Sequence, residues 1–181
     1  MNDKTVVWVV GTSASGKETF ARRTPQDTAL IAQLGWKGKR VTVSAESLEH
    51  LAQFPDDPVT LKRERILQEV PLLLEDHDVV LLKWQFVDSD ADRIVRLQDE
   101  LPTAKHEIIV LHAAEEDLAV RLPRKSWWKQ WGSNDFAATE LALVADAVES
   151  LSAHHDVTHL HSGAEEGYRP YQIPTEQLIR A

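Results

Sequence analysis

The sequence predicts an α/β domain in which a mostly parallel sheet of five strands carries helices on both faces. Runs of consecutive β-branched and other apolar residues, typical of strands buried on both sides, recur along the chain. Segments with helical spacing of apolar residues lie between these runs, and this alternation is typical of doubly wound sheets. The length of 181 residues has room for one domain and not for two.

The clearest expected strand is residues 6–10, which read VVWVV. Thr24 and Pro25 are expected to start a new helix, because a hydroxyl followed by proline is typical of helix N-termini. The other expected strands are residues 41–43, 79–82 with an extension to 87, 108–111 and, with a weaker pattern, 157–160. The expected helices are residues 17–23, 26–34, 47–54, 60–74, 90–101, 115–122 and 135–151.

The composition excludes several functional classes. The chain has no cysteine, which excludes disulfide scaffolds, Cys-ligated zinc and thiol catalysis. Its formal net charge is −9, whereas a non-specific nucleic-acid binder needs a cationic surface. No apolar stretch approaches the ~18 residues that span a bilayer, and the apolar run near the start is too short for a signal peptide. We therefore expect a soluble cytoplasmic protein with no membrane partner.

A glycine-rich loop is the most specific motif in the chain. Residues 11–19 read GTSASGKET, directly after the first expected strand and at the start of the first expected helix. Gly11, Gly16 and Lys17 match the spacing of a phosphate-binding loop. The glycines let backbone N–H groups turn inward around phosphate oxygens, and Lys17 places an ammonium near the β- and γ-phosphates. The alternative is a Gly/Ser turn that precedes a lysine by chance, and the preceding strand argues against it.

On these residues the chain resembles the P-loop kinase group, which includes adenylate, nucleoside, shikimate and gluconate kinases. The resemblance implies a three-layer P-loop NTPase fold with a five-stranded, mostly parallel sheet and a small lid. It also implies ATP and Mg²⁺ as cofactors, an acceptor-binding insertion over residues 24–75 and a lid over residues 121–134. The residues that it implies for nucleotide binding are Gly11, Thr12, Ser13, Ala14, Ser15, Gly16, Lys17, Glu18 and Thr19.

The position after the loop lysine departs from the P-loop pattern. Glu18 stands where the motif has Ser or Thr, and Thr19 follows. Adenylate kinases also lack that hydroxyl, and by this resemblance Thr19 contacts the α-phosphate. Glu18 is expected either to hold Mg²⁺ through water or to point to solvent, because a carboxylate beside a triphosphate is repulsive without a cation between them. Asp88 is a weak second candidate for the metal, with helix capping as its alternative role.

Candidate acceptor residues follow the second and third expected strands, because ligands of open α/β sheets bind beyond the carboxyl ends of the strands. Glu46 is expected to accept the proton of an attacking hydroxyl, with Ser44 near the metal. The same two residues equally suit the capped start of a helix. The tip of the third strand is expected to form the acceptor pocket, in which an indole stacks on a planar group. The residues of that tip are Lys83, Trp84 and Gln85.

The segment after the fourth expected strand carries Arg121, Arg124 and Lys125, which resemble the lid cations of nucleotide kinases. Arg121 and Arg124 are expected to stabilise the charge on the transferring phosphoryl group, with Arg124 as the preferred catalytic arginine. The alternative is a solvated helix end whose cations complement the helix dipole.

Aromatic residues near the end of the chain have two interpretations each. Trp127 and Trp131 are expected to pack the lid against the domain, and the alternative is stacking on exposed bases. Tyr168 is expected to cover the adenine, and the alternative is a surface tail. His159 and His161 would share one face of a strand, but no metal-ligand spacing accompanies them.

Together these residues predict a phosphotransferase that moves the γ-phosphoryl of ATP to a hydroxyl or phosphate of a nucleoside- or nucleotide-type acceptor. Its expected catalytic residues are Lys17, Glu46, Arg121 and Arg124. The alternatives are a small sugar or polyol kinase, a kinase acting on a modified base in DNA, which the net charge disfavours, and a non-catalytic nucleotide-sensing module. The expected partners are a nucleotide donor and a small-molecule acceptor, and the expected state is a monomer or homodimer.

Overall fold

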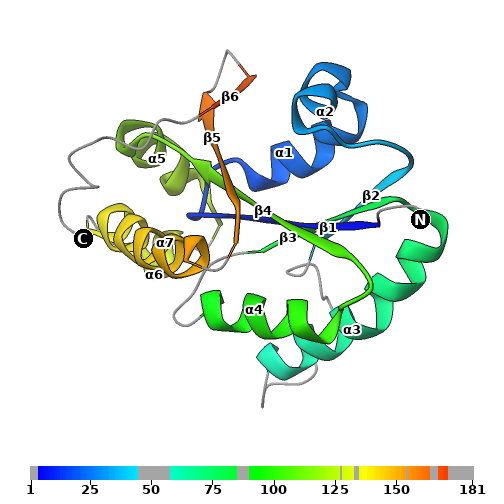
Figure 1. Cartoon of the computed structure of the whole chain (residues 1–181). Helices are drawn as coiled ribbons and strands as arrows, with labels where there is room; N and C mark the ends of the chain where they lie inside the picture. Colours follow the sequence, from blue (N-terminus) through cyan, green and yellow to red (C-terminus); the bar gives the residue numbers. More distant parts are fainter. Residues whose placement is uncertain are drawn as a thin grey trace.

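The computed structural model describes residues 4–44, 58–84, 90–126, 128–132, 135–153, 155–163 and 167–170. These residues form one six-stranded sheet with the order β2-β3-β1-β4-β5-β6 (Figure 1). The strands from β2 to β5 pair in parallel, and β6 is antiparallel to β5. Their bounds are β1 Thr5–Gly11, β2 Arg40–Ser44, β3 Val79–Lys83, β4 Lys105–His112, β5 Val157–Gly163 and β6 Gly167–Pro170.

The predicted fold class is confirmed, with one strand more than expected. Strand β6 was not anticipated, because its sequence GYRP has neither alternation nor a β-branched residue. Its pairing with β5 depends on backbone hydrogen bonding at the sheet edge, which carries little local signal. The helical elements are α1 Lys17–Arg23, η1 Thr24–Gln26, α2 Thr28–Leu34, α3 Pro58–Asp76, α4 Asp90–Glu100, α5 Glu115–Arg121, η3 Leu122–Arg124, α6 Trp128–Trp131 and α7 Phe136–Ser152.

The start of α2 lies later than the sequence indicated. Thr24 and Pro25 belong to the short 3₁₀ turn η1, and α2 begins only after Asp27. The Asp27 side chain accepts a hydrogen bond of 3.0 Å from the backbone N–H of Leu30, so Asp27 caps the helix in place of Thr24. The helix expected over residues 47–54 lies outside the described residues. No described helix is long and apolar enough to span a membrane.

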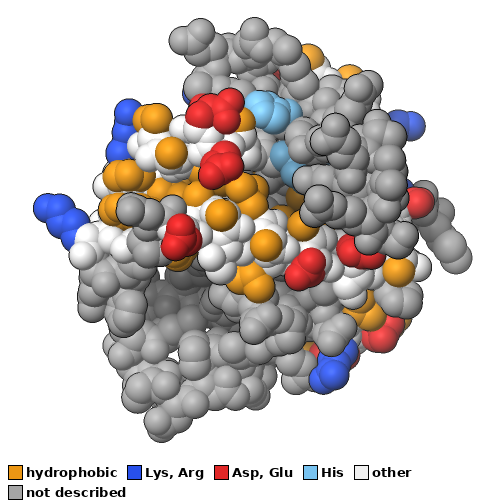
Figure 2. All heavy atoms as spheres, turned by 90° about the vertical axis from the view of Figure 1, so that its left-hand side faces the viewer, with side chains coloured by type: hydrophobic (Ala, Val, Ile, Leu, Met, Phe, Trp, Pro, Cys, Tyr) orange, Lys and Arg blue, Asp and Glu red, His pale blue; other side chains and the backbone are white. Residues whose placement is uncertain are grey.

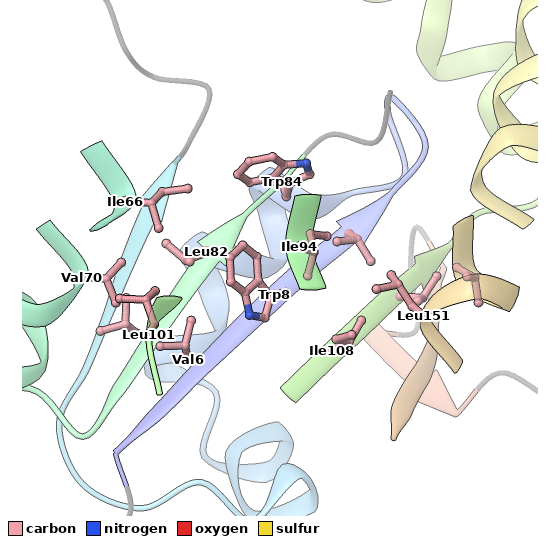
Figure 3. Close-up of a cluster of buried hydrophobic side chains, with 14 of the residues drawn as sticks. Val6, Trp8, Ile66, Val70, Leu82, Trp84, Ile94, Leu101, Ile108 and Leu151 are labelled. Carbon is pink, nitrogen blue, oxygen red and sulfur yellow. The ribbon is translucent and has the colours of Figure 1, made fainter. Parts of the chain in front are cut away.

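Strand β1 is buried along its whole length between two helical layers. Because side chains alternate across a strand, Val6, Trp8 and Val10 enter the core on one face and Val7 and Val9 on the other. Helices α3, α4 and α7 cover the first face, and α1 and α2 cover the second (Figure 1). The first core is drawn in Figure 3, where side chains from these helices surround Trp8.

The strand order places the loop after β1 at a functional position. The chain runs from β1 to the edge strand β2, returns to β3 beside β1, and then crosses to β4 on the other side of β1. The order of the strands therefore reverses at β1. In open α/β sheets ligands bind at such a switch point, beyond the carboxyl ends of the strands. The strand order alone therefore indicates a ligand site at the loop between β1 and α1.

A pair of histidines joins β4 to β5 near this edge. The Nε2 atom of His112 lies 2.9 Å from Nδ1 of His159, and the two rings stack at 5.1 Å. Burial, and the neighbouring His159 and His161, lower the pKa of His112 from its ordinary value of 6.5 to about 4. The pKa of His159 is also lowered by burial. Both rings therefore pack as neutral groups at neutral pH.

The histidine pair predicts loss of stability in mild acid. Between pH 6.5 and about 4 the unfolded chain binds a proton at residue 112 that the folded chain does not bind. The free energy of unfolding should therefore fall as the pH is lowered through this window, by roughly 2 kcal/mol once partial exposure is allowed for. Urea unfolding at several pH values measures this slope. His112→Asn should reduce this slope but not abolish it, because burial also lowers the pKa of His106 and of His159. Equal slopes in wild type and His112→Asn would contradict the prediction.

Candidate functional site

The loop between β1 and α1 has a backbone that only glycine permits at two positions. Gly11 has φ +146°, and a Cβ there would lie 2.5 Å from the carbonyl oxygen of Leu111. Gly16 has φ +97° and occupies the N-cap of α1. Among the described residues, no side chain caps this helix by a hydrogen bond. The spacing of the two glycines is therefore required by a close approach to β4 and by a left-handed turn.

Lys17 lies over the loop that precedes it. Its side chain is buried, and Nζ donates hydrogen bonds of 2.8 Å to the carbonyl of Gly11 and 2.6 Å to the carbonyl of Thr12. Two buried hydroxyl oxygens of the same loop, Oγ1 of Thr12 and Oγ of Ser15, have no hydrogen-bond partner within the described part of the chain. A buried polar group without a partner is costly, and a polyphosphate would supply acceptors to both. The donor set of the loop thus fits a phosphate-bearing ligand.

Ser162, at the end of β5, holds the loop from the side. Its Oγ donates to the carbonyl of Ser15 and lies 3.2 Å from the carbonyl of His112. The residue is buried. One hydroxyl therefore connects the phosphate loop with the ends of β4 and β5.

Arg121 lies beside the loop. Its Nη1 is 3.4 Å from the carbonyl of Ala14, and its Nη2 is 3.3 Å from the carbonyl of Ser162. Asp117, one turn earlier in α5, accepts a hydrogen bond of 3.1 Å from the same Nη2. The guanidinium is thus oriented by three oxygen atoms at the rim of the loop. Arg124 is exposed at the end of η3.

Lys83 at the end of β3 forms an ion pair with the residue after the loop lysine. Its Nζ lies 2.6 Å from Oε2 of Glu18. The Lys83 side chain is 11 % exposed and that of Glu18 is 74 % exposed. The hydrogen bond and the charge of Lys83 lower the pKa of Glu18, and the charges of Arg22 and Lys125 act in the same direction. Lys83 was expected in the acceptor pocket, and the structure places its ammonium on Glu18 instead.

Trp84 is a correction to the predicted acceptor pocket. Its indole is only 6 % exposed and belongs to the core on the α3 and α4 side of the sheet. It meets Trp8 edge to face with ring centroids 6.0 Å apart, and Figure 3 shows the two rings among aliphatic side chains. The ring is therefore occupied by core packing and offers no stacking surface to a ligand.

Glu140 of α7 contacts the loop and was missed by the sequence analysis. Its Oε2 accepts a hydrogen bond of 2.6 Å from the backbone N–H of Ser13, and its Oε1 accepts one of 2.8 Å from the Ser13 hydroxyl. The Glu140 carboxylate thus accepts the hydrogen bond of a loop N–H group that would otherwise be available to an anion. An acid in the middle of a long helix carries no local signal of this role, because the contact joins residues 127 positions apart.

The described residues do not fit a magnesium site. The acid beside the loop, Glu18, is already paired with an ammonium, and a divalent cation at the same place would meet the charge of Lys83. Within the described ranges, no group of three His, Cys, Asp or Glu side chains could hold a metal ion. Mg²⁺ at a nucleotide site needs only one or two protein ligands beside phosphates and water, so the poor fit rests on the pairing of Glu18 with Lys83. Asp88, the second metal candidate, lies outside the described residues.

Several expected site residues are not described by the structure. Glu46 and Gln85 lie outside the described residues, and so do the side chains of Ser44, Trp131 and Tyr168. Trp127 is likewise outside. Their roles stay predictions.

Comparison with known proteins identifies the fold. No protein-family model and no curated protein sequence matches the chain. Shikimate kinase from Acinetobacter baumannii in complex with shikimate is similar in structure, with a TM-score of 0.51 and 14% identity over 98% of this chain and 89% of that chain. A tunicamycin resistance protein of Deinococcus radiodurans is similar with a TM-score of 0.51 and 17% identity over 98% of this chain and 92% of that chain.

A third similar structure is the Pnkp1/Rnl/Hen1 RNA repair complex. It has a TM-score of 0.55 and 17% identity over 94% of this chain, and the match spans 49% of that chain. Identities this low establish the architecture and not the activity. The chain has a P-loop kinase-like fold.

The contact of Glu140 with Ser13 predicts that the acid opposes nucleotide binding. Glu140→Gln removes a negative charge beside the loop, so the affinity for ATP should rise about 3- to 10-fold. Isothermal titration calorimetry measures the Kd. Glu149→Gln, an exposed position on the same helix, is the matched control and should leave the Kd unchanged. Weaker binding in Glu140→Gln would contradict the prediction and assign Glu140 to shaping the loop.

Proposed function

We propose that the protein transfers the γ-phosphoryl of ATP to a hydroxyl or phosphate of a small acceptor, with a nucleoside or nucleotide as the first choice. One observation carries this proposal: a glycine-shaped loop at the switch point of the sheet is lined by a buried lysine and by two buried hydroxyls that have no partner among the described residues. An arginine held at the rim of the loop supports transfer over simple binding.

The proposed reaction is an in-line displacement at the γ-phosphorus. The acceptor oxygen forms a bond to phosphorus while the bond to the β,γ-bridging oxygen breaks, and ADP leaves with that electron pair. Lys17 and the loop amides hold the phosphates, and Thr19 anchors the α-phosphate. Glu46 takes the proton of the acceptor hydroxyl, and Arg121 with Arg124 stabilises the charge on the transferring group.

Fewer residues support a nucleoside or nucleotide acceptor than the sequence indicated. Burial of Trp84 removes one of the aromatic surfaces that favoured a planar base. Trp128 is half-buried and packs edge to face on Phe136 at 5.6 Å, which suits a structural role. A small sugar or polyol acceptor is therefore the nearest alternative.

A DNA acceptor requires a basic surface near the lid. Figure 2 shows the face that carries α5 and α7, where acidic side chains are spread across the middle and Lys and Arg side chains lie at the margins. Such a distribution repels a phosphate backbone. This alternative stays disfavoured.

A nucleotide sensor without turnover is the second candidate function. Its support is the Glu140 carboxylate on the Ser13 amide, because an acid beside the terminal phosphate disfavours the charge that transfer develops. The sensor and the kinase share the binding site and differ in chemistry alone.

The proposal predicts that nucleotide binding depends on Lys17. Lys17→Ala removes the one ammonium that the loop motif supplies, and the Kd for ATP should rise by about 30-fold or more. Calorimetric titration measures the change, with circular dichroism as the check on folding. Lys105→Ala, whose side chain is 65% exposed on β4, is the control. Equal affinity of Lys17→Ala and wild type would reject the phosphate-loop assignment.

Turnover should separate the two candidate functions. A panel of nucleosides, nucleotides, sugars and polyols is offered with ATP, and ADP formation that requires one acceptor supports the kinase. Arg121→Ala and Arg124→Ala should then lower kcat by about tens-fold with a small change in the ATP Kd. Arg23→Ala, exposed at the end of α1, is the control. ATP binding without turnover for every acceptor would favour the sensor.

A further inference from the structure

Two positions beside the phosphate loop differ from those that hold the metal in P-loop enzymes. In P-loop enzymes a hydroxyl after the loop lysine and an acid on a neighbouring strand hold Mg²⁺. Here the position after the lysine carries Glu18, and the end of the neighbouring strand β3 carries Lys83. The register sets Lys83 opposite Val9 of β1, and the N–H of Trp84 donates to the carbonyl of Val9 at 2.9 Å. The end of β3 is thus fixed beside the start of the loop.

We propose that the Lys83 ammonium, held by Glu18, supplies the positive charge that P-loop enzymes take from Mg²⁺, so that this chain binds its nucleotide without a divalent metal. The inference rests on the nucleotide site of the proposed function. It extends that site by assigning Lys83 as a residue that contacts the phosphates.

The burial of Lys83 supports this role. An ammonium with 11 % of its side chain exposed loses much of its hydration, and such a group requires a partner of opposite charge. Glu18, on the first turn of α1, provides that partner at 2.6 Å while 74 % of its own side chain faces solvent. The acid is therefore the solvent-facing member of the pair, and the cation is the buried member.

The surrounding charges also disfavour a divalent ion. Lys17 lies on the same loop, and Arg22 and Lys125 add positive potential at Glu18. A metal placed between Glu18 and the phosphates would meet these cations and a fixed ammonium. A nucleotide without metal carries more negative charge than its magnesium complex, and it suits this cluster better.

The experiment compares ADP and ATP binding by calorimetry with EDTA and with saturating MgCl₂. For wild type, the Kd of each nucleotide measured with EDTA should be no more than about threefold higher than the Kd measured with Mg²⁺. Binding that requires Mg²⁺ overturns this inference and leaves the proposed function intact. Absence of binding in both conditions overturns both.

Two single variants test the charge assignment. Lys83→Met keeps the length of the aliphatic stem and removes the charge, and with EDTA the Kd should rise about tenfold or more. Glu18→Gln keeps an oxygen that can accept a hydrogen bond from Lys83 but removes the negative charge that competes with the phosphates, so the Kd with EDTA should fall. Lys105→Met controls for loss of a lysine elsewhere. An unchanged Kd in either test variant would overturn the role of Lys83.

A double variant converts the site to the metal-dependent arrangement. Glu18→Ser together with Lys83→Asp places a hydroxyl and an acid where P-loop enzymes have them. Binding should then be weak with EDTA and recover with Mg²⁺, the reverse of the wild-type behaviour. Equal binding of the double variant in both conditions would contradict the proposed replacement of the metal by the ammonium of Lys83. A thermal unfolding measurement is the check that the variant is folded.

Discussion

The approach of Gly11 to the carbonyl of Leu111 is the contact on which the candidate site depends. It brings the loop after β1 so close to β4 that any Cβ would collide with the neighbouring backbone. Ser162 completes the attachment by joining the carbonyl of Ser15 to the end of β4. The shape of the loop is therefore set by three adjacent strand ends, and a phosphate ligand would meet an arrangement that is already ordered.

Three cations of the candidate site are paired with oxygen atoms of the protein itself. Lys17 donates to carbonyls, Lys83 pairs with Glu18, and Arg121 is oriented by Asp117. Each cation thus has an oxygen partner, which stabilises a cluster of positive charge in a chain of net charge −9. A polyphosphate would have to displace some of these oxygen partners, so its affinity would reflect an exchange of partners and not a simple gain.

The sequence predicted the strands and the position of the glycine-rich loop well, because each depends on short-range patterns. Continuous β-branched runs mark strands buried on both faces, and the glycine spacing marks the loop. The same reasoning misplaced Trp84, because an aromatic residue at a strand end is compatible with both a pocket and a core. Its burial against Trp8 follows from the packing of α3 and α4 on that face. The edge strand β6 was missed because its residues carry no strand pattern.

The sequence by itself determined that a lysine-bearing loop follows a central strand, since that motif is contiguous and its backbone requirements are local. Only the tertiary structure decided which charges surround the loop. Glu18 and Lys83 are 65 positions apart, and Ser13 and Glu140 are 127 apart. These pairs meet because the strand order places β3 and β4 on either side of β1 and because α7 packs back on the sheet. Long-range pairing of this kind depends on the summed packing of many elements and leaves no pattern in any one segment.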